Sequence, residues 1–399
     1  MFRVTQYLNE LAAPTPPVPA RPPKGPVVIW NLVRRCNLSC RHCYTASADK
    51  DFAGELSTGE VFAVMKDLRD FGVPVVILSG GEPLVRPDIF EISRHAKELG
   101  FLVCLSSNGT LIDETNIRQI ADIGYDYVGI SIDGLRETHD RFRNKQGAFD
   151  AAMRGLRLCR EHGIKTGLRF TLTRDNAPEL PALLQLIEDE GIDKFYLSHL
   201  NYAGRGNANR RDDAMLNTTR WAMERLFDTG WDFIQRGLKK EIVTGNNDAD
   251  GVYLLWWARR RFGGDLERLR ARLAQWGGNA TGVNIANIDN RGNVHPDSFW
   301  WSHDLGNVRQ RPFSRIWPDT SDPLMAGLKS RPRPLKGRCG RCAYVDICGG
   351  NTRLRAYQLT GDPWAEDPAC YLTDEEIGLA ADERPGPAAR TKMAGAGGN

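Results

Sequence analysis

The sequence lacks a long hydrophobic run and a strong excess of either charge. No apolar run reaches the roughly 18 residues of a membrane-spanning helix, and the opening MFRVTQ has no apolar stretch typical of a secretion signal. Lys and Arg total 53 against 50 Asp and Glu, a net charge of +3, which excludes a generic binder of nucleic acid or anionic membranes. We therefore expect a soluble cytoplasmic protein with no nucleic-acid or membrane partner.

Cysteine is also scarce. The 399 residues contain nine, too few for a secreted disulfide scaffold. Three of them gather at 36–43 and four at 339–370, and such clustering in a reducing compartment is more typical of metal binding than of disulfides. Cys104 and Cys159 lie instead in apolar periodic stretches, and we expect them to be small buried side chains.

The length predicts two or three domains, and 41% apolar residues are enough to bury a core. Residues 1–26 contain a proline-rich segment, PTPPVPARPPKGP, which excludes regular helix and central strand. We expect one domain at 27–240 and a smaller one at 241–382. Residues 383–399 are rich in Gly, Ala and Pro, and we expect a flexible tail.

Strand-like and helix-like segments alternate from residue 27 to about 240, where we expect the alternation to end. Ser57 with Glu60, and Asn176 with Glu179, predict capping boxes at two helix starts. Six parallel β/α units predict the α/β class, as either a partial barrel or a doubly wound sheet. The expected strands are 27–33, 73–79, 101–107, 127–133, 165–173 and 194–200. Helices at 249–262 and 264–276 should precede a hairpin of 283–289 with 293–296.

The first cysteine cluster follows the first expected strand directly. Cys36, Cys40 and Cys43 can hold three corners of a [4Fe-4S] cluster and leave one iron without a protein ligand. An open ligand position is where a metal centre does chemistry, and loops after strands form the working face of β/α folds. A zinc knuckle or a chance grouping of cysteines is the alternative.

The C-x3-C-x2-C loop resembles the signature of the radical S-adenosylmethionine (SAM) superfamily, whose fold is a partial (β/α)6 barrel. The resemblance implies that SAM binds the open iron. It also implies that one electron, from a donor of the ferredoxin or flavodoxin type, cleaves SAM to methionine and a 5′-deoxyadenosyl radical that takes a hydrogen atom from the substrate. His42, just before the third cysteine, occupies the position that packs near the adenine.

A second motif, SGGEP at 79–83, ends the second expected strand. Gly80 and Gly81 would let the backbone approach a ligand closely, and the Glu82 carboxylate can accept from an ammonium group. The motif resembles the GGEP sequence with which the superfamily binds the SAM amino group. Alone it would be an ordinary turn.

Strand alternation places further polar residues inside the barrel. Ser131, Asp133 and Arg169 should point inward, because their strand neighbours are apolar. They match the residue types that the superfamily uses for the SAM ribose and carboxylate, and a structural Arg169–Asp133 ion pair is the alternative. Asn108 is either a neighbour of SAM or a turn residue.

The second cluster reads C-x2-C-x5-C-x21-C and comprises Cys339, Cys342, Cys348 and Cys370. It resembles the auxiliary-cluster part of the SPASM/twitch extensions of radical SAM enzymes. Thr352 and Asp297 stand where the seven-cysteine version has cysteines. Both departures affect the same auxiliary cluster, so we expect one auxiliary [4Fe-4S] cluster.

Longer stretches, including 196–206, 244–254 and 361–372, resemble the radical SAM enzymes of heme d1 biosynthesis. This resemblance implies a tetrapyrrole substrate, an iron-containing didecarboxysiroheme that loses two propionate side chains where oxo groups appear. The alternatives are a sibling enzyme of heme synthesis, a peptide-modifying maturase and a zinc-stapled scaffold. Arg205 is a candidate for the substrate carboxylates, and His199, Tyr202, His295 and His303 for the substrate or its iron, although lone histidines are more often structural.

Overall fold

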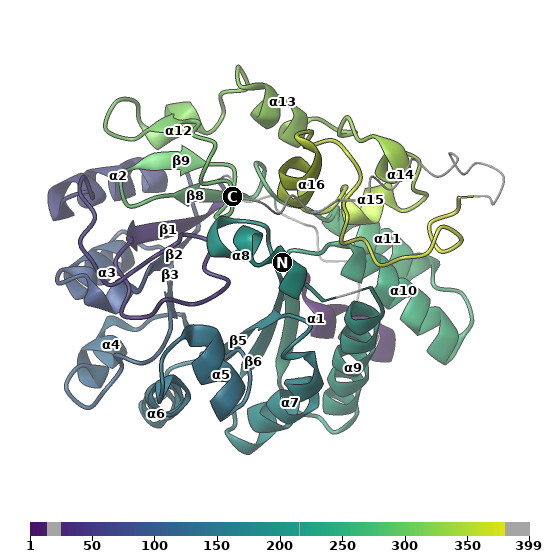
Figure 1. Cartoon of the computed structure of the whole chain (residues 1–399), viewed down its shortest axis with the longest axis horizontal. Helices are drawn as coiled ribbons and strands as arrows, with labels where there is room; N and C mark the ends of the chain where they lie inside the picture. The colour runs from purple at the N-terminus through teal and green to yellow at the C-terminus, as the bar shows by residue number, and fades with distance from the viewer. Residues whose placement is uncertain (14–24, 215, 380–399) are drawn as a thin grey trace, which may run out of the picture.

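Ten strands form one sheet in the computed structural model, which describes residues 1–13, 25–214 and 216–379 (Figure 1). The expected tail at 383–399 and most of the proline-rich stretch lie outside the described residues. The sheet order is β10-β9-β8-β1-β2-β3-β4-β5-β6-β7. The strands are β1 (Val27–Val33), β2 (Val75–Gly80), β3 (Leu102–Ser107), β4 (Tyr127–Ser131), β5 (Thr166–Leu172), β6 (Lys194–His199), β7 (Glu241–Gly245), β8 (Ile285–Ile288), β9 (Asn293–His295) and β10 (Gly306–Asn307).

The strand order decides between the two expected architectures. Strands β1 to β7 are all parallel and follow one another in chain order. The first strands of a doubly wound sheet are split to both sides of a switch point, whereas β1 to β7 run in one direction across this sheet without a reversal. The partial barrel is therefore confirmed, and its carboxyl-terminal strand ends share one mouth.

All six expected strands are present, but the alternation does not end at 240 as we expected. β7 follows there and pairs with β6, while β8 pairs in parallel with β1. The predicted hairpin is β8 and β9, and it extends the barrel sheet instead of standing apart. Segments on both sides of residue 240 thus share one sheet, and the division into 27–240 and 241–382 stays a prediction.

Helices cover the outer side of the curved sheet (Figure 1). Within the described residues the helices are α1 (Val4–Ala12), α2 (Thr58–Asp70), α3 (Ile89–Glu98), α4 (Ile117–Ile123), α5 (Arg136–Arg143), α6 (Ala148–Glu161), α7 (Leu180–Asp189), α8 (Gly204–Ala208), α9 (Leu216–Gln235), α10 (Ala249–Phe262), α11 (Glu267–Trp276), α12 (Phe313–Ile316), α13 (Pro323–Lys329), α14 (Gly337–Gly340), α15 (Val345–Cys348) and α16 (Arg353–Thr360). None of these is both long enough and apolar enough to cross a membrane.

The first predicted capping box is confirmed and the second is wrong. Ser57 Oγ accepts from the backbone N–H of Glu60, whose carboxylate accepts from the Ser57 N–H at 2.8 Å, so α2 begins where predicted. Asn176 is fully buried and instead donates to the carbonyls of Asp133 and Thr171, at 3.1 and 2.9 Å. It ties the loop after β4 to the end of β5, which fixes the position of Asp133.

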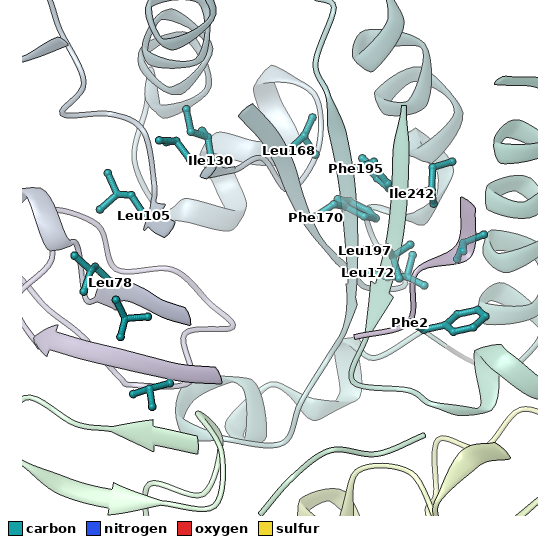
Figure 2. Packing of buried hydrophobic residues seen from close by; sticks show 14 of the residues in the cluster. Phe2, Leu78, Leu105, Ile130, Leu168, Phe170, Leu172, Phe195, Leu197 and Ile242 are labelled. Atoms are coloured by element: carbon teal, nitrogen blue, oxygen red, sulfur yellow. The ribbon is translucent and has the colours of Figure 1, made fainter. Parts of the chain in front are cut away.

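Alternate strand residues form the core, as the sequence pattern predicts. Ile130, Leu168, Phe170 and Leu172 are at most 1% exposed, and Figure 2 shows them with apolar residues of the neighbouring strands. Phe2 joins this core, and its backbone exchanges two hydrogen bonds with Thr244 of β7, at 2.7 and 2.8 Å. The outer edge of β7 is therefore paired, which protects it from association with other chains.

Candidate functional site

The loop after β1 brings the first three cysteines together. Cys36 and Cys40 are buried, Cys43 is partly buried, and the three pack around Leu38. Burial raises the pKa of the Cys36 thiol to about 12 and also raises that of Cys40. Iron binding would therefore displace protons from these thiols, because thiolate is the form that ligates metal.

Each of the three sulfur atoms also accepts a hydrogen bond, two from nearby backbone N–H groups and one from a distant side chain. The backbone N–H groups of Leu38 and Ser47 donate to Cys36 Sγ and Cys43 Sγ, both at 3.4 Å. The donor to Cys40 Sγ is a guanidinium nitrogen of Arg143, at 3.5 Å. Such bonds stabilise thiolates and orient them as ligands.

The GGE segment after β2 runs beside the start of the cysteine loop. The Gly81 N–H donates to Val33 O at 2.6 Å, and the Glu82 N–H donates to Arg35 O at 2.9 Å. A Cβ atom on Gly80 would lie 2.4 Å from Val33 O, and one on Gly81 would lie 2.2 Å from Arg35 O. We expected these glycines to admit a ligand. In the structure they admit the backbone of the cysteine loop.

We expect Gly81→Ala to loosen the cysteine loop, because its new methyl group would overlap two backbone carbonyls that cannot rotate away. Overpacking of this kind costs about 3 kcal/mol, at the upper end of its usual range. Chemical denaturation and iron analysis should show lower stability and lost iron. Gly59→Ala is the matched control, since its Cβ meets nothing within 4 Å. Equal behaviour of the two variants would contradict the packing role of Gly81.

Glu82 links the GGE segment to the loop after β3. Its carboxylate is fully buried and accepts from Ser107 Oγ at 2.8 Å and from the Asn108 N–H at 2.7 Å. Burial raises the pKa of Glu82 to about 7 in spite of these donors. The Asn108 amide in turn donates to Asn37 Oδ1 at 2.8 Å and approaches Cys36 Sγ at 3.9 Å. Asn108 is thus in contact with the cysteine loop.

Asp133 lies fully buried at the end of β4, close to the cysteine loop. It pairs with Arg143, accepts from the Thr171 N–H at 2.7 Å and lies 3.6 Å from His42 Nε2. Burial alone would raise the pKa of Asp133, but the Arg143 charge, the neighbouring imidazoles and the Thr171 N–H together hold that pKa below its usual value. Burial lowers the pKa of His42 to about 4. The alternative Arg169–Asp133 pair is therefore wrong.

Arg143 was missed because helix α5 reads as a charged surface helix. Arg143 follows His139 by one helical turn, and both are buried, while Arg136 and Arg141 are exposed. That four-residue spacing is the only sequence signal for its position.

Arg169 on β5 and Ser131 on β4 are partners in the strand register, and alternation predicts that both point into the barrel. The Arg169 guanidinium donates to Ser106 Oγ and lies 5.3 Å from the centre of the Tyr196 ring. Strands β3 to β6 therefore bring polar groups to one patch inside the barrel, beside Asp133.

Several buried polar atoms around this loop have no protein partner within the described residues. They include His42 Nδ1, Arg143 Nε, Arg205 Nη2 and both amide atoms of Asn201. Buried polar groups are nearly always satisfied, so these atoms indicate a place for a polar ligand. Arg205 donates to Cys40 O at 2.7 Å and to Ser47 O at 2.8 Å, so it holds the cysteine loop rather than awaiting a substrate carboxylate.

The second cysteine cluster surrounds one cavity. Cys339, Cys342, Cys348 and Cys370 all line it, together with apolar residues of α10 and the chain after Cys370. Burial raises the pKa of all four thiols, that of Cys342 to about 11. The Asp367 and Tyr344 N–H groups donate to Cys339 and Cys342 at 3.4 Å. Among the described residues, no three His, Cys, Asp or Glu side chains are arranged as the ligands of a single metal ion.

The two cysteine replacements in the second cluster region take other roles. Thr352 is buried and its hydroxyl donates to Asn246 O at 3.4 Å. Asp297 is buried and accepts from Thr281 Oγ1 at 2.6 Å, and burial raises its pKa. Neither lines the cavity of the four cysteines.

The remaining candidates each face a carboxylate. Nε2 of His199 lies 3.0 Å from Asp250, that of His295 lies 3.5 Å from Asp289, and that of His303 lies 2.9 Å from Asp322. Tyr202 donates to Asp213 at 3.0 Å. These contacts favour the structural role for the three histidines.

The comparisons with known proteins agree with this arrangement. Residues 30–187 match the radical SAM superfamily. A pre-heme d1 synthase of Dinoroseobacter shibae is 55% identical over 384 residues, 96% of this chain and 95% of that protein. An Fe-coproporphyrin III synthase of Methanosarcina barkeri is 45% identical over 358 residues, 89% and 90% of the two chains. The structure of Streptococcus suis SuiB bound to S-adenosylmethionine has a TM-score of 0.69 at 18% identity, covering 88% of this chain and 78% of SuiB.

The likeness to SuiB supports the fold, and the identity to the two curated relatives extends across nearly the whole chain. The matched segment contains the three-cysteine loop, the GGE segment and Arg169. This chain belongs to the radical SAM superfamily.

Proposed function

We propose that this chain is a pre-heme d1 synthase, which removes propionate side chains from an iron tetrapyrrole, didecarboxysiroheme, on the way to the oxo groups of heme d1. The observation that carries this proposal is the 55% identity to a pre-heme d1 synthase along 96% of the chain. Identity of this extent covers both cysteine clusters and the sheet that joins them.

Cys36, Cys40 and Cys43 would hold the catalytic [4Fe-4S] cluster in this proposal. Bound there with SAM, the cluster would supply a 5′-deoxyadenosyl radical that takes a hydrogen atom from the substrate. Their hydrogen-bond donors and the orphaned polar atoms around the loop support the assignment. A ferredoxin or flavodoxin would deliver the electron.

Different residues near the cysteine loop would bind different groups of SAM. Glu82 would bind the SAM amino group, while Gly80 and Gly81 hold the cysteine loop beside it, and His42 would pack near the adenine. Arg169, with Ser131, would bind the carboxylate and ribose, because its guanidinium is held inside the barrel by contacts to Ser106 and Tyr196. Asn108 and Asp133 would fix the loop against these groups.

Cys339, Cys342, Cys348 and Cys370 would hold one auxiliary [4Fe-4S] cluster. Ligands of a zinc ion converge on one centre about 2.3 Å away, whereas each thiolate of a four-iron cluster binds a different corner. Four cysteines that line one cavity support a shared site for this cluster.

Anaerobic reconstitution tests the proposal. With SAM, reductant and didecarboxysiroheme, we expect 5′-deoxyadenosine and a tetrapyrrole whose mass reflects loss of propionate groups. A peptide substrate is the negative control. Release of 5′-deoxyadenosine without any change in the tetrapyrrole mass would refute the substrate assignment. Two zinc ions per chain and no absorbance at about 400 nm would refute both clusters.

A second candidate is an Fe-coproporphyrin III synthase, favoured by the 45% identity to that enzyme. The same reaction separates the two candidates, because the product would then have the mass of Fe-coproporphyrin III.

A further inference from the structure

Arg143 lies between a cluster cysteine and a buried carboxylate. It is the last residue of α5, only 7% exposed, and one guanidinium nitrogen donates to Cys40 Sγ at 3.5 Å. Another nitrogen pairs with Asp133, whose side chain is fully buried. Its Nε has no protein partner among the described residues. The guanidinium therefore contributes a fixed positive charge directly beside the sulfur.

Other titratable groups lie around this pair, and the buried Glu82 is one of them. His42 faces Asp133 from the cysteine loop at 3.6 Å, and His139 Nδ1 accepts from the Asp133 N–H at 3.0 Å. Arg205 contacts the Cys40 backbone instead of its sulfur. Arg143 thus supplies the charged hydrogen bond to Cys40 Sγ, and Asp133 is the ion-pair partner of Arg143.

A charge next to a cluster ligand shifts the balance between the oxidised and reduced cluster. Reduction adds one negative charge, which a nearby guanidinium stabilises and a nearby carboxylate opposes. Hydrogen bonds to the sulfur atoms act in the same direction as the positive charge. Because both side chains are buried, solvent screens these effects only weakly.

We infer that Arg143 is a positioning residue that sets the reduction potential of the catalytic cluster through Cys40, and that Asp133 limits this effect. The inference rests on the assignment of Cys36, Cys40 and Cys43 to a cluster, and it is independent of the tetrapyrrole. The guanidinium makes the cluster easier to reduce, and the paired carboxylate holds the guanidinium in place while offsetting part of its charge.

An EPR-monitored redox titration without SAM tests this inference. The catalytic signal is the one that disappears in C36A/C40A/C43A. For Arg143→Met we expect the one-electron reduction constant to fall at least tenfold, a shift of about 59 mV to lower potential. Asp133→Asn should shift the potential upward, and R143M/D133N should return toward the wild-type value. Arg143→Lys keeps the charge and should shift the potential less than Arg143→Met.

Arg141→Met is the matched control, because Arg141 lies on the same helix but is exposed. A merely structural role predicts that Arg143→Met and Asp133→Asn both lose iron and that R143M/D133N loses more. It does not predict that the two single substitutions shift the reduction potential in opposite directions. An Arg143→Met cluster with full iron content and an unchanged potential would overturn the inference. If Arg143→Met does not retain iron, the reduction potentials of the other two single variants decide. Asp133→Asn should then raise the potential and Arg143→Lys should lower it slightly, and the absence of these opposite shifts would overturn the inference. If C36A/C40A/C43A loses no EPR signal, the assignment of these cysteines to a cluster would be overturned instead.

Discussion

Replacing Cys36, Cys40 and Cys43 with alanine should lower the iron content from about eight to about four atoms per chain and abolish 5′-deoxyadenosine formation. The expected loss is complete, because these thiolates are the protein ligands of the cluster in the proposed site and no other cysteine packs with them in the part of the chain that the structure describes. Iron analysis and chromatography of the anaerobic reaction measure both quantities. The remaining iron would belong to the second cysteine group.

Cys104→Ala is the control for this experiment. Cys104 belongs to neither group and lies on β3, paired with Ile77 of β2. The variant should keep about eight irons and its 5′-deoxyadenosine yield. A triple variant that still cleaves SAM reductively would show that the catalytic assignment is wrong.

Arg355→Met should strongly destabilise the protein. Arg355 and Asp367 form an ion pair with two contacts, at 2.9 and 3.1 Å, and neither side chain is exposed. Removing the guanidinium leaves a buried unpaired carboxylate, which costs about 3–5 kcal/mol. The urea midpoint of the reconstituted enzyme should fall accordingly. Since the Asp367 N–H donates to Cys339 Sγ, iron should also be lost at the second cysteine group.

The double variant R355M/D367L separates charge from shape. Two apolar side chains bury no unpaired charge, so part of the lost stability should return. Recovery should be incomplete, because Arg355 also donates to the carbonyls of Asn246 and Leu200, at 2.7 and 3.3 Å. A double variant less stable than Arg355→Met would contradict the ion-pair explanation.

Much of the barrel could be predicted from the sequence because its strands are apolar and its helices amphipathic. Ile130 and Phe170 fall on the buried side that alternation assigns to them, and the α2 capping box begins where Ser57 and Glu60 place it. β7 was missed because EIVTG is short and follows the long helix α9. The pairing of β8 with β1 joins residues far apart in the chain, and no local pattern reports such a contact.

The candidate site was predictable at positions where metal chemistry requires one residue type. It was not predictable at positions where the residue is selected by packing in the folded chain. Cysteine spacing identified both groups of sulfur atoms, and each group is gathered in the structure. The partner of Asp133 was not predictable, because several arginines have suitable charge and only the path of α5 selects Arg143. Gly81 was recognised as special, but the neighbour that requires it is protein backbone.

The parallel pairing of β8 with β1 has a consequence for engineering this chain. A chimera that exchanges the C-terminal portion between relatives at residue 240 would import a foreign strand beside β1, whose register with β8 runs from Val27 with Ile285 to Trp30 with Ile288. Junctions placed after β9 would keep the native neighbour of β1. The tolerated crossover points in this chain are thus set by strand adjacency rather than by the position of the cysteine motifs.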